Sequence, residues 1–239
     1  MPVIDLVGFD ADDTLWRSQD YFDQAQRDFE ALLAPYIDIE RSDTQARLYG
    51  VESRNIAVFG YGVKGMALSM VEAAIAITDA RIAARDIHRI VELAKALLVH
   101  PVELLPGVAD AVHAIAARHP VVLITKGDLF HQERKVAASG LGDVFGRIEV
   151  VSEKDAATYA RVLGECGVPA TRFAMVGNSL RSDIAPVLEL GGWAVHMPYH
   201  TTWAHEAVAA PLAHPRLRTV EAPAMLPAAL AAITDANAC

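Results

Sequence analysis

The amino-acid sequence predicts an α/β protein: a doubly wound, Rossmann-like parallel sheet whose chain is interrupted by an all-helical insertion. Two observations lead to this fold class. Short apolar runs alternate with helical patterns from about residue 104 to the end, and a further apolar run stands near the N-terminus. Residues 16–103 contain four successive helical patterns and no strand pattern. Alternating strands and helices are typical of a parallel sheet covered by helices.

Five short apolar runs are the predicted strands. Each has ~4–8 residues and is apolar almost throughout, which is typical of parallel strands buried on both faces. The runs are Leu6–Asp10, Val121–Thr125, Arg147–Val151, Phe173–Gly177 and Trp193–Met197.

Helical patterns separate the later runs. They cover Val108–Arg118, Asp128–Ser139, Asp155–Cys166 and Arg181–Leu190, and glycines at 140, 167 and 191 are placed to end three of them. The last ~25 residues are expected to form a short strand and a helix.

The insertion consists of four predicted helices. They cover Asp20–Leu33, Asp43–Asn55 behind a Ser42 cap, Val63–Ile77 and Asp86–Val99. Pro35 and Pro101 end the first and the last of these helices. We therefore expect an α/β domain made of residues 1–15 and 104–239, and a helical domain made of residues 16–103.

Composition excludes several classes of function. The net charge is −9 and the basic residues are scattered among acids, so nucleic acid is not an expected partner. No apolar stretch reaches the ~18 residues of a membrane span, and the N-terminus lacks the basic start of a secretory signal. We therefore expect a cytoplasmic protein without a membrane partner. Cys166 and Cys239 are too few and too far apart for a disulfide framework or a cysteine-based zinc site.

Polar side chains follow the predicted strands at their carboxyl ends, where an open parallel sheet binds its ligands. Three carboxylates crowded into "DADD" would repel one another, and Mg²⁺, which takes oxygen ligands from carboxylates and phosphates, would offset that repulsion. A hydroxyl, backbone amides and a lysine would supply the donors that phosphoryl transfer requires. The polar residues and the glycine at these strand ends are Asp10, Asp12, Asp13, Thr125, Lys126, Gly127, Lys154, Asn178, Ser179 and Asp183.

With these motifs in order, the chain resembles the haloacid dehalogenase superfamily of hydrolases. "DADDT" (Asp10–Thr14) fits the family's Asp-x-Asp-x-Thr motif, and "VVLITKGD" (Val121–Asp128) fits its strand ending in Thr or Ser. Lys154 fits its single lysine, and "VGNSLRSD" (Val176–Asp183) fits its final acidic motif. The helical insertion fits the cap domain that many members carry after the first strand.

The resemblance implies a role for each motif residue. Asp10 would be the nucleophile that forms an aspartyl-phosphate, and Asp12 would protonate the leaving group and then activate water. Thr125, Lys126, Gly127 and Lys154 would bind the phosphoryl group. Mg²⁺ would be held by the Asp10 side chain, the Asp12 backbone carbonyl and Asp183, beside Asn178, where many members have an acid. Asp13 is expected only to hydrogen-bond the turn backbone.

The expected function is Mg²⁺-dependent hydrolysis of a small phosphorylated metabolite. A 2-haloacid dehalogenase would share the fold and the nucleophile, but members that resemble dehalogenases lack the second aspartate, here Asp12. A phosphomutase would differ only in the fate of the aspartyl-phosphate. A non-enzymatic phospho-receiver module would need an aspartate at the end of a later strand, where this sequence has Thr125 and Ser152.

Three further features have simpler interpretations. The segment Phe59–Gly65 lacks phosphate-loop spacing and is expected to be an interhelical loop, although Lys64 could meet an anionic substrate when the cap closes. His196, His200 and His205 lack the spacing of a zinc site. The apolar faces of Val63–Ile77 and Asp86–Val99 indicate packing within the insertion or a dimer surface, so monomer and homodimer remain open.

Overall fold

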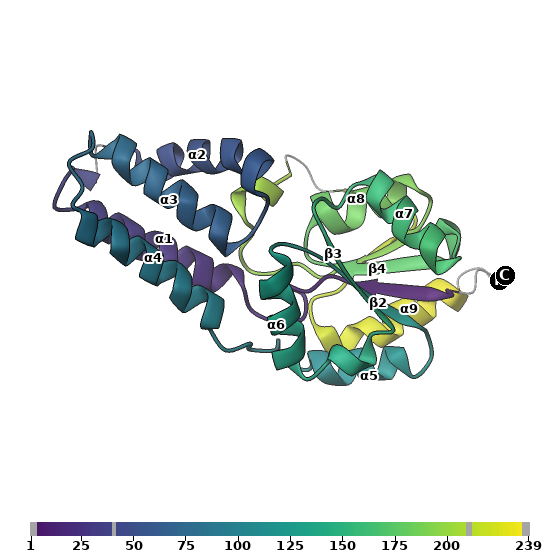
Figure 1. Ribbon diagram of the computed structural model, residues 1–239. Coiled ribbons are helices and arrows are strands. Elements are labelled where there is room, and N and C mark those ends of the chain that lie inside the picture. The colour runs from purple at the N-terminus through teal and green to yellow at the C-terminus, as the bar shows by residue number, and fades with distance from the viewer. Residues whose placement is uncertain (1–3, 40–41, 209–211, 236–239) are drawn as a thin grey trace. The chain divides into compact units, whose positions relative to one another are not determined.

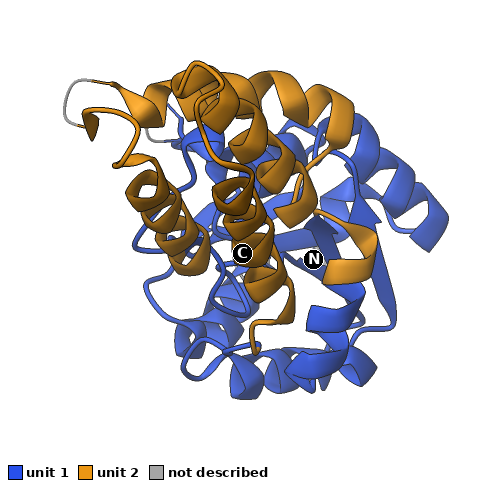
Figure 2. Cartoon of the chain, turned by 60° about the vertical axis from the view of Figure 1, so that its left-hand side comes forward, with its two compact units in different colours: residues 1–19, 102–126, 132–239 blue, residues 20–101, 127–131 orange. Residues whose placement is uncertain are grey.

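The structure is a computed structural model that describes residues 4–39, 42–208 and 212–235. The chain forms two compact units (Figure 2), and we describe each by itself. The first unit lies within residues 1–19, 102–126 and 132–239, and the second contains residues 20–101 and 127–131. Cys239 lies outside the described residues.

A parallel sheet with the strand order β3-β2-β1-β4-β5-β6 forms the centre of the first unit (Figure 1). Every neighbouring pair in this sheet is parallel. The strands are β1 (Leu6–Phe9), β2 (Val121–Lys126), β3 (Arg147–Val151), β4 (Phe173–Gly177), β5 (Trp193–His196) and β6 (Leu217–Thr219). The predicted α/β fold class is confirmed.

Both faces of the sheet are covered, because successive side chains of each strand point to opposite sides. Val7 and Leu123 belong to one apolar cluster together with residues of α5 (Val108–Ala116) and α9 (Leu226–Asp235). Leu6 and Ile124 belong to a second cluster with residues of α7 (Ala156–Cys166) and α8 (Ala185–Glu189). Figure 1 shows α5 and α9 on one side of the sheet and α7 and α8 on the other.

One predicted helix of this unit differs in form. The segment expected to be a regular helix from Arg181 starts with a π-helical turn, η4 (Leu180–Ile184), and continues as the short α8. Ser179 caps the turn, since its side chain accepts a hydrogen bond from the Ser182 amide, and the amides of Asp183 and Ile184 both donate to the Ser179 carbonyl. Single π-helical turns are frequent at functional sites.

Glycine ends the helices as predicted. Gly140, Gly167 and Gly191 have φ values of 71°, 68° and 78°, a left-handed conformation that other residues rarely adopt. The remaining helical elements of the unit are α6 (Leu129–Ser139), whose first three residues belong to the second unit, and the short 3₁₀ turns η2 (Gly142–Val144), η3 (Ala170–Arg172), η5 (Ala204–Glu206) and η6 (Pro223–Met225).

The second unit consists mainly of four helices around their own apolar core. The helices are α1 (Gln19–Leu33), α2 (Thr44–Phe59), α3 (Val63–Ile77) and α4 (Ala84–Val99). Phe29, Met70 and Ile90 are almost fully buried in this core. Ser42 does not cap α2 as expected; its hydroxyl lies 2.8 Å from the Thr44 hydroxyl, and Asp43 at the helix start has a left-handed backbone.

The chain leaves and re-enters the first unit along a short paired segment. The Arg17 amide donates to the Glu103 carbonyl at 2.9 Å, and the Leu105 amide donates to the Leu15 carbonyl at 2.9 Å. Trp16 lies between them, is 1% exposed and belongs to the core of the α/β unit. No helix among the described residues combines the length and the apolar character that crossing a membrane requires.

Candidate active site

The carboxyl ends of β1 and β4 meet at the centre of the sheet. The chain order reverses there, because β1 to β3 run outward in one direction and β4 to β6 in the other. Such a switch point is where open α/β sheets bind their ligands. Asp10 directly follows β1, and its amide donates to the Val176 carbonyl of β4 at 2.9 Å. Residues 178–183 follow β4 and bring further polar side chains to the same place.

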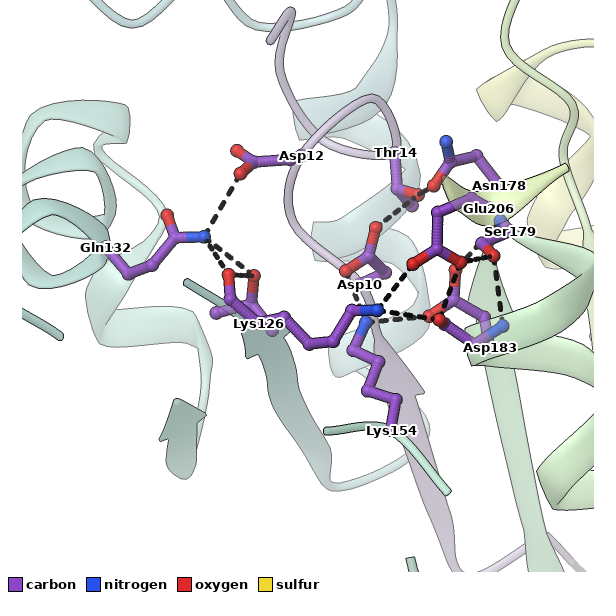
Figure 3. A network of polar contacts seen from close by, with 12 residues as sticks. Asp10, Asp12, Thr14, Lys126, Gln132, Lys154, Asn178, Ser179, Asp183 and Glu206 are labelled. Carbon is purple, nitrogen blue, oxygen red and sulfur yellow. Dashed lines mark hydrogen bonds and ion pairs between the residues drawn. The ribbon is translucent and has the colours of Figure 1, made fainter. Parts of the chain in front are cut away.

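Asp10 is buried and is contacted through both carboxylate oxygens (Figure 3). Its Oδ1 accepts a hydrogen bond from Lys154 Nζ at 2.5 Å, and its Oδ2 accepts one from the Thr14 hydroxyl at 3.1 Å. Burial and the nearby Asp183 carboxylate raise the pKa of Asp10 to about 7, although the Lys154 ammonium acts in the opposite direction.

Lys154 joins Asp10 to the last acidic motif. Its Nζ lies 2.7 Å from Asp183 Oδ1, and both residues are almost completely buried. Burial opposes the charged form of the lysine, but the Asp10 and Asp183 carboxylates raise its pKa above the ordinary value. The single lysine therefore stays positive between two carboxylates.

The backbone around Gly177 makes room for Asp183. A Cβ atom at Gly177 would lie 2.4 Å from the Asp183 carboxylate, closer than real Cβ contacts. Asp183 Oδ2 also accepts a hydrogen bond from the Ser179 amide at 2.9 Å. Glycine at this strand end therefore lets the carboxylate lie directly over the chain.

Asn178 completes this side of the site. Its Oδ1 lies 3.2 Å from the Thr14 hydroxyl, which also faces Asp10. Its backbone carbonyl lies 3.0 Å from His196 Nε2. Burial lowers the pKa of His196, which favours the neutral ring.

Asp12 is held by three side chains, two of which come from α6. Lys135 Nζ lies 2.5 Å and 2.7 Å from its two oxygens, Gln132 Nε2 donates at 3.1 Å, and Trp16 Nε1 donates at 2.6 Å. Burial alone would raise the pKa of Asp12, but the Lys135 ammonium and these hydrogen bonds lower it. The carboxylate is therefore ionised and fixed in orientation.

Asp13 belongs to the turn, as predicted. Its backbone is left-handed with φ of 61°, and its Oδ1 accepts hydrogen bonds from the amides of Ser18 and Gln19 at 2.9 Å and 3.0 Å. Burial raises the pKa of Asp13 to about 7, against the effect of these hydrogen bonds. Asp13 thus fixes the start of α1.

The end of β2 is fixed by Gln132. The Gln132 amide nitrogen donates to the buried Thr125 hydroxyl at 3.0 Å and to the Lys126 carbonyl at 2.6 Å. Since it also reaches Asp12, Gln132 links the ends of β1 and β2. Its own oxygen is buried and has no hydrogen-bond partner among the described residues.

Lys126 and Glu206 form a second charged group in the site. Lys126 Nζ lies 2.5 Å from Glu206 Oε1, 2.9 Å from the Ser182 hydroxyl and 3.3 Å from Glu153 Oε1. The Ser179 and Ser182 hydroxyls both donate to Glu206 Oε2, at 2.5 Å and 2.6 Å. The Lys126 side chain therefore already contacts a partly buried carboxylate.

The two remaining predicted binding residues belong to the helical unit. Gly127 has φ of 132°, which few residues other than glycine adopt. Lys64 Nζ lies 2.9 Å from Asp128 Oδ2 and 6.0 Å from the centre of the Phe130 ring. Lys64 therefore contacts the segment 127–131 of its own unit. A role for Lys64 in substrate binding stays a prediction.

Sequence reasoning missed three side chains of this site: Gln132, Lys135 and Glu206. Gln132 and Lys135 occupy successive turns of a helix that follows a motif strand, a weak signal that α6 presents polar groups to β1 and β2. Glu206 lies 80 positions from Lys126 in the chain and belongs to no motif. No local pattern in the sequence indicates its contact.

The donor set near Asp10 fits a hard divalent cation. Among the described residues no group of three or more His, Cys, Asp or Glu side chains is placed to hold a metal ion. The ligand set predicted from sequence has two carboxylates, an amide and a backbone carbonyl, and it stays a prediction. These are all oxygen donors, which Mg²⁺ prefers. Among the described contacts, Asp10 and Asp183 share the Lys154 ammonium. Burial and, after it, the Asp183 carboxylate raise the pKa of Asp10, and a bound cation would offset both effects.

Fold and site together show a Rossmann-like α/β protein with a buried aspartate at the switch point of its sheet. A family model described as haloacid dehalogenase-like hydrolase matches residues 4–191. The chain therefore belongs to the haloacid dehalogenase-like hydrolases.

Solved structures agree with this assignment. A haloacid dehalogenase-like family hydrolase from Xanthomonas campestris is 57% identical, with a TM-score of 0.87 over 97% of this chain and 92% of that one. A 2-haloacid dehalogenase from Pseudomonas syringae is 23% identical, with a TM-score of 0.62 over 96% and 99%. A predicted phosphoglycolate phosphatase from Haemophilus somnus is 15% identical, with a TM-score of 0.60 over 95% and 97%. The last two show the fold alone. No curated protein gave a match to the chain.

Proposed function

We propose that the protein is a Mg²⁺-dependent phosphomonoesterase that acts on a small phosphorylated metabolite through an aspartyl-phosphate. The observation that carries this proposal is the second aspartate, Asp12, which three side chains hold in a fixed orientation two residues after Asp10. A leaving alkoxide needs a proton, whereas a leaving halide does not. An ordered second carboxylate therefore favours phosphoryl transfer over dehalogenation.

The chain's own residues account for the first step. A carboxylate oxygen of Asp10 attacks phosphorus as the bond to the leaving oxygen breaks. Asp12, which is ionised in the free site, takes up a proton from the phosphate ester monoanion as the ester binds and delivers it to the leaving oxygen. Lys154, which lies 2.5 Å from Asp10, offsets the charge of the nucleophile and of the transferred group. The Thr125 hydroxyl, oriented by Gln132, and the neighbouring amides bind the phosphoryl oxygens.

The second step uses the same groups in reverse roles. Asp12, ionised after the first proton transfer, takes a proton from water as the water attacks phosphorus and the bond to Asp10 breaks. Lys135 and Trp16 keep its carboxylate in place. The products are inorganic phosphate and free Asp10, and Asp12 then releases its proton to the phosphate or to solvent.

Mg²⁺ would be held by Asp10, Asp183, the Asp12 backbone carbonyl and Asn178, and it would supply charge neutralisation for the phosphoryl oxygens. Asn178 in place of an acid leaves Asp183 as the main charged partner of the cation after Asp10.

The second candidate is a 2-haloacid dehalogenase, which the buried Asp10–Lys154 pair also favours. One screen distinguishes the two. The protein is incubated with a panel of phosphorylated metabolites and with 2-chloropropionate, each with Mg²⁺ and with EDTA. The proposal predicts phosphate release that needs Mg²⁺ and no chloride release. Chloride release that persists in EDTA, without phosphatase activity, would favour the dehalogenase.

A further inference from the structure

Glu206 is a largely buried carboxylate that lies outside all four motifs yet contacts Lys126. It ends the 3₁₀ turn η5, after β5, and both its oxygens are engaged in the contacts shown in Figure 3. Its side chain is only 13% exposed. Burying a carboxylate costs free energy unless it is paired and hydrogen-bonded, and Glu206 is both.

The two oxygens of Glu206 have different partners. Oε1 faces the Lys126 ammonium at 2.5 Å. Oε2 accepts hydrogen bonds from the Ser179 and Ser182 hydroxyls at 2.5 Å and 2.6 Å. Burial alone would raise the pKa of Glu206, but Lys126 and the two serines lower it, so the residue stays charged.

A short series of contacts leads from Glu206 to the predicted cation ligand Asp183. The Ser179 hydroxyl, which donates to Glu206, accepts a hydrogen bond from the Ser182 amide at 3.0 Å. The Ser179 amide donates to Asp183 Oδ2 at 2.9 Å, and the Asp183 amide donates to the Ser179 carbonyl at 2.9 Å. Glu206 therefore restrains the π-helical turn that presents Asp183.

The segment that carries Glu206 is itself attached to this turn. Arg181 donates a hydrogen bond to the backbone carbonyl of His205. Tyr159, which is fully buried, donates to the Ser182 carbonyl at 3.1 Å from the other side. The turn from Ser179 to Asp183 is thus held between α7 and η5.

We infer that Glu206 is a positioning residue for the cation site: it holds the turn that orients Asp183 and neutralises Lys126 beside it. The inference rests on the proposed function, because it assumes that Asp183 binds Mg²⁺. Partners that orient metal ligands are commonly worth about 10- to 100-fold in metal affinity or activity. Loss of the Glu206 charge would also leave the positive charge of Lys126 less neutralised, and its repulsion of Mg²⁺ would further weaken Mg²⁺ binding.

The test is Mg²⁺ binding measured by titration calorimetry, with the Mg²⁺-induced rise in Tm as a second readout that needs no turnover. Glu206→Gln, which is nearly isosteric, is expected to raise the Mg²⁺ Kd about 10-fold or more. Ser179→Ala, which removes the hydroxyl between Glu206 and the turn, is expected to act in the same direction. The lost turnover of Glu206→Gln is expected to return as Mg²⁺ is raised.

Glu153→Gln is the matched control. It removes the same charge from another carboxylate that faces Lys126, at 3.3 Å, but Glu153 is half-exposed and its Oε1 accepts a hydrogen bond from the Lys154 amide. Its Mg²⁺ Kd is expected to change by less than about 3-fold, since exposed pairs contribute little. An equal weakening in both variants would mean that net charge, and not positioning, is responsible.

The outcomes separate this inference from the function on which it rests. A Kd for Glu206→Gln within about 2-fold of wild type would overturn the positioning role while the phosphatase proposal stands. Absence of Mg²⁺ binding by the wild type would overturn both. Tm values measured without Mg²⁺ identify any variant that is simply unstable, and Ser179→Ala then provides the decisive comparison.

Discussion

Gly177→Ala tests the placement of Asp183 over the end of β4. The added Cβ would lie 2.4 Å from the Asp183 carboxylate, whereas ordinary contacts begin at 3.4 Å, so the carboxylate must move by about 1 Å. That movement lengthens its contacts with the Ser179 amide (2.9 Å) and Lys154 Nζ (2.7 Å). Each charge-assisted hydrogen bond is worth about 1.5–3 kcal/mol, and overpacking typically costs about 1–3 kcal/mol. We expect the free energy of unfolding to fall by about 2–3 kcal/mol.

Urea unfolding followed by tryptophan fluorescence measures this change, because Trp16, Trp193 and Trp203 all belong to the α/β unit. EDTA is present so that cation binding does not contribute. Gly164→Ala is the control: it lies exposed in α7 with no atom within 4 Å of the added Cβ, and alanine should stabilise the helix by about 0.5–1 kcal/mol. If the free energy of unfolding of Gly177→Ala lay within about 0.5 kcal/mol of the wild-type value and turnover were retained, the placement of Asp183 would be refuted.

Three further predictions address the nucleophile, the acid and the helical unit. Asp10→Asn should reduce kcat to a few per cent of wild type or less without lowering Tm, and substantial residual phosphatase activity would remove Asp10 from its role. Lys135→Met releases the Asp12 carboxylate and should therefore lower kcat for alkyl phosphates roughly 10- to 100-fold. The loss should be smaller for p-nitrophenyl phosphate, because its leaving group needs little protonation. Equal losses of kcat on both substrates would argue against an acid role for Asp12. Ile90→Ala should lower the free energy of unfolding of the helical unit by about 2–5 kcal/mol, measured by circular dichroism melts. Val91→Ala, on the exposed side of α4, should change that free energy by less than about 0.5 kcal/mol. Similar losses in both variants would contradict the described core.

The sheet could be predicted from sequence because its signals are local. A buried parallel strand needs an apolar run, and four of the six strands have one over most of their length, such as Val121–Lys126. The edge strand Arg147–Val151 has the charged Arg147 and Glu149 among its apolar residues and is only partly buried. The sixth, Leu217–Thr219, has only three residues and lies among prolines, so its position was expected only roughly. The π-helical turn at Leu180–Ile184 has no distinct periodicity and was expected as ordinary helix.

The site was partly predictable for the same reason. Parallel strands bring their carboxyl ends together, so Asp10, Lys154 and Asp183 could be expected to converge, and they do. Orientation within the site could not be predicted: Asp12 faces Lys135 and Lys126 faces Glu206, and each pairing depends on tertiary contacts across long stretches of chain. Such contacts leave no trace in local residue spacing.

The phosphorylated enzyme is the most direct test of the proposed chemistry. The protein is mixed with p-nitrophenyl phosphate and Mg²⁺, quenched in acid, digested, and the peptides are analysed by mass spectrometry. Asp12→Asn should accumulate the intermediate, because the first step needs little acid with this leaving group whereas the second still needs a base for water. We predict a phosphoryl group on the peptide that contains Asp10, more abundant in Asp12→Asn than in wild type and absent in Asp10→Asn. Phosphate release without any phosphorylated peptide in Asp12→Asn, or a phosphoryl group on another residue, would contradict the account.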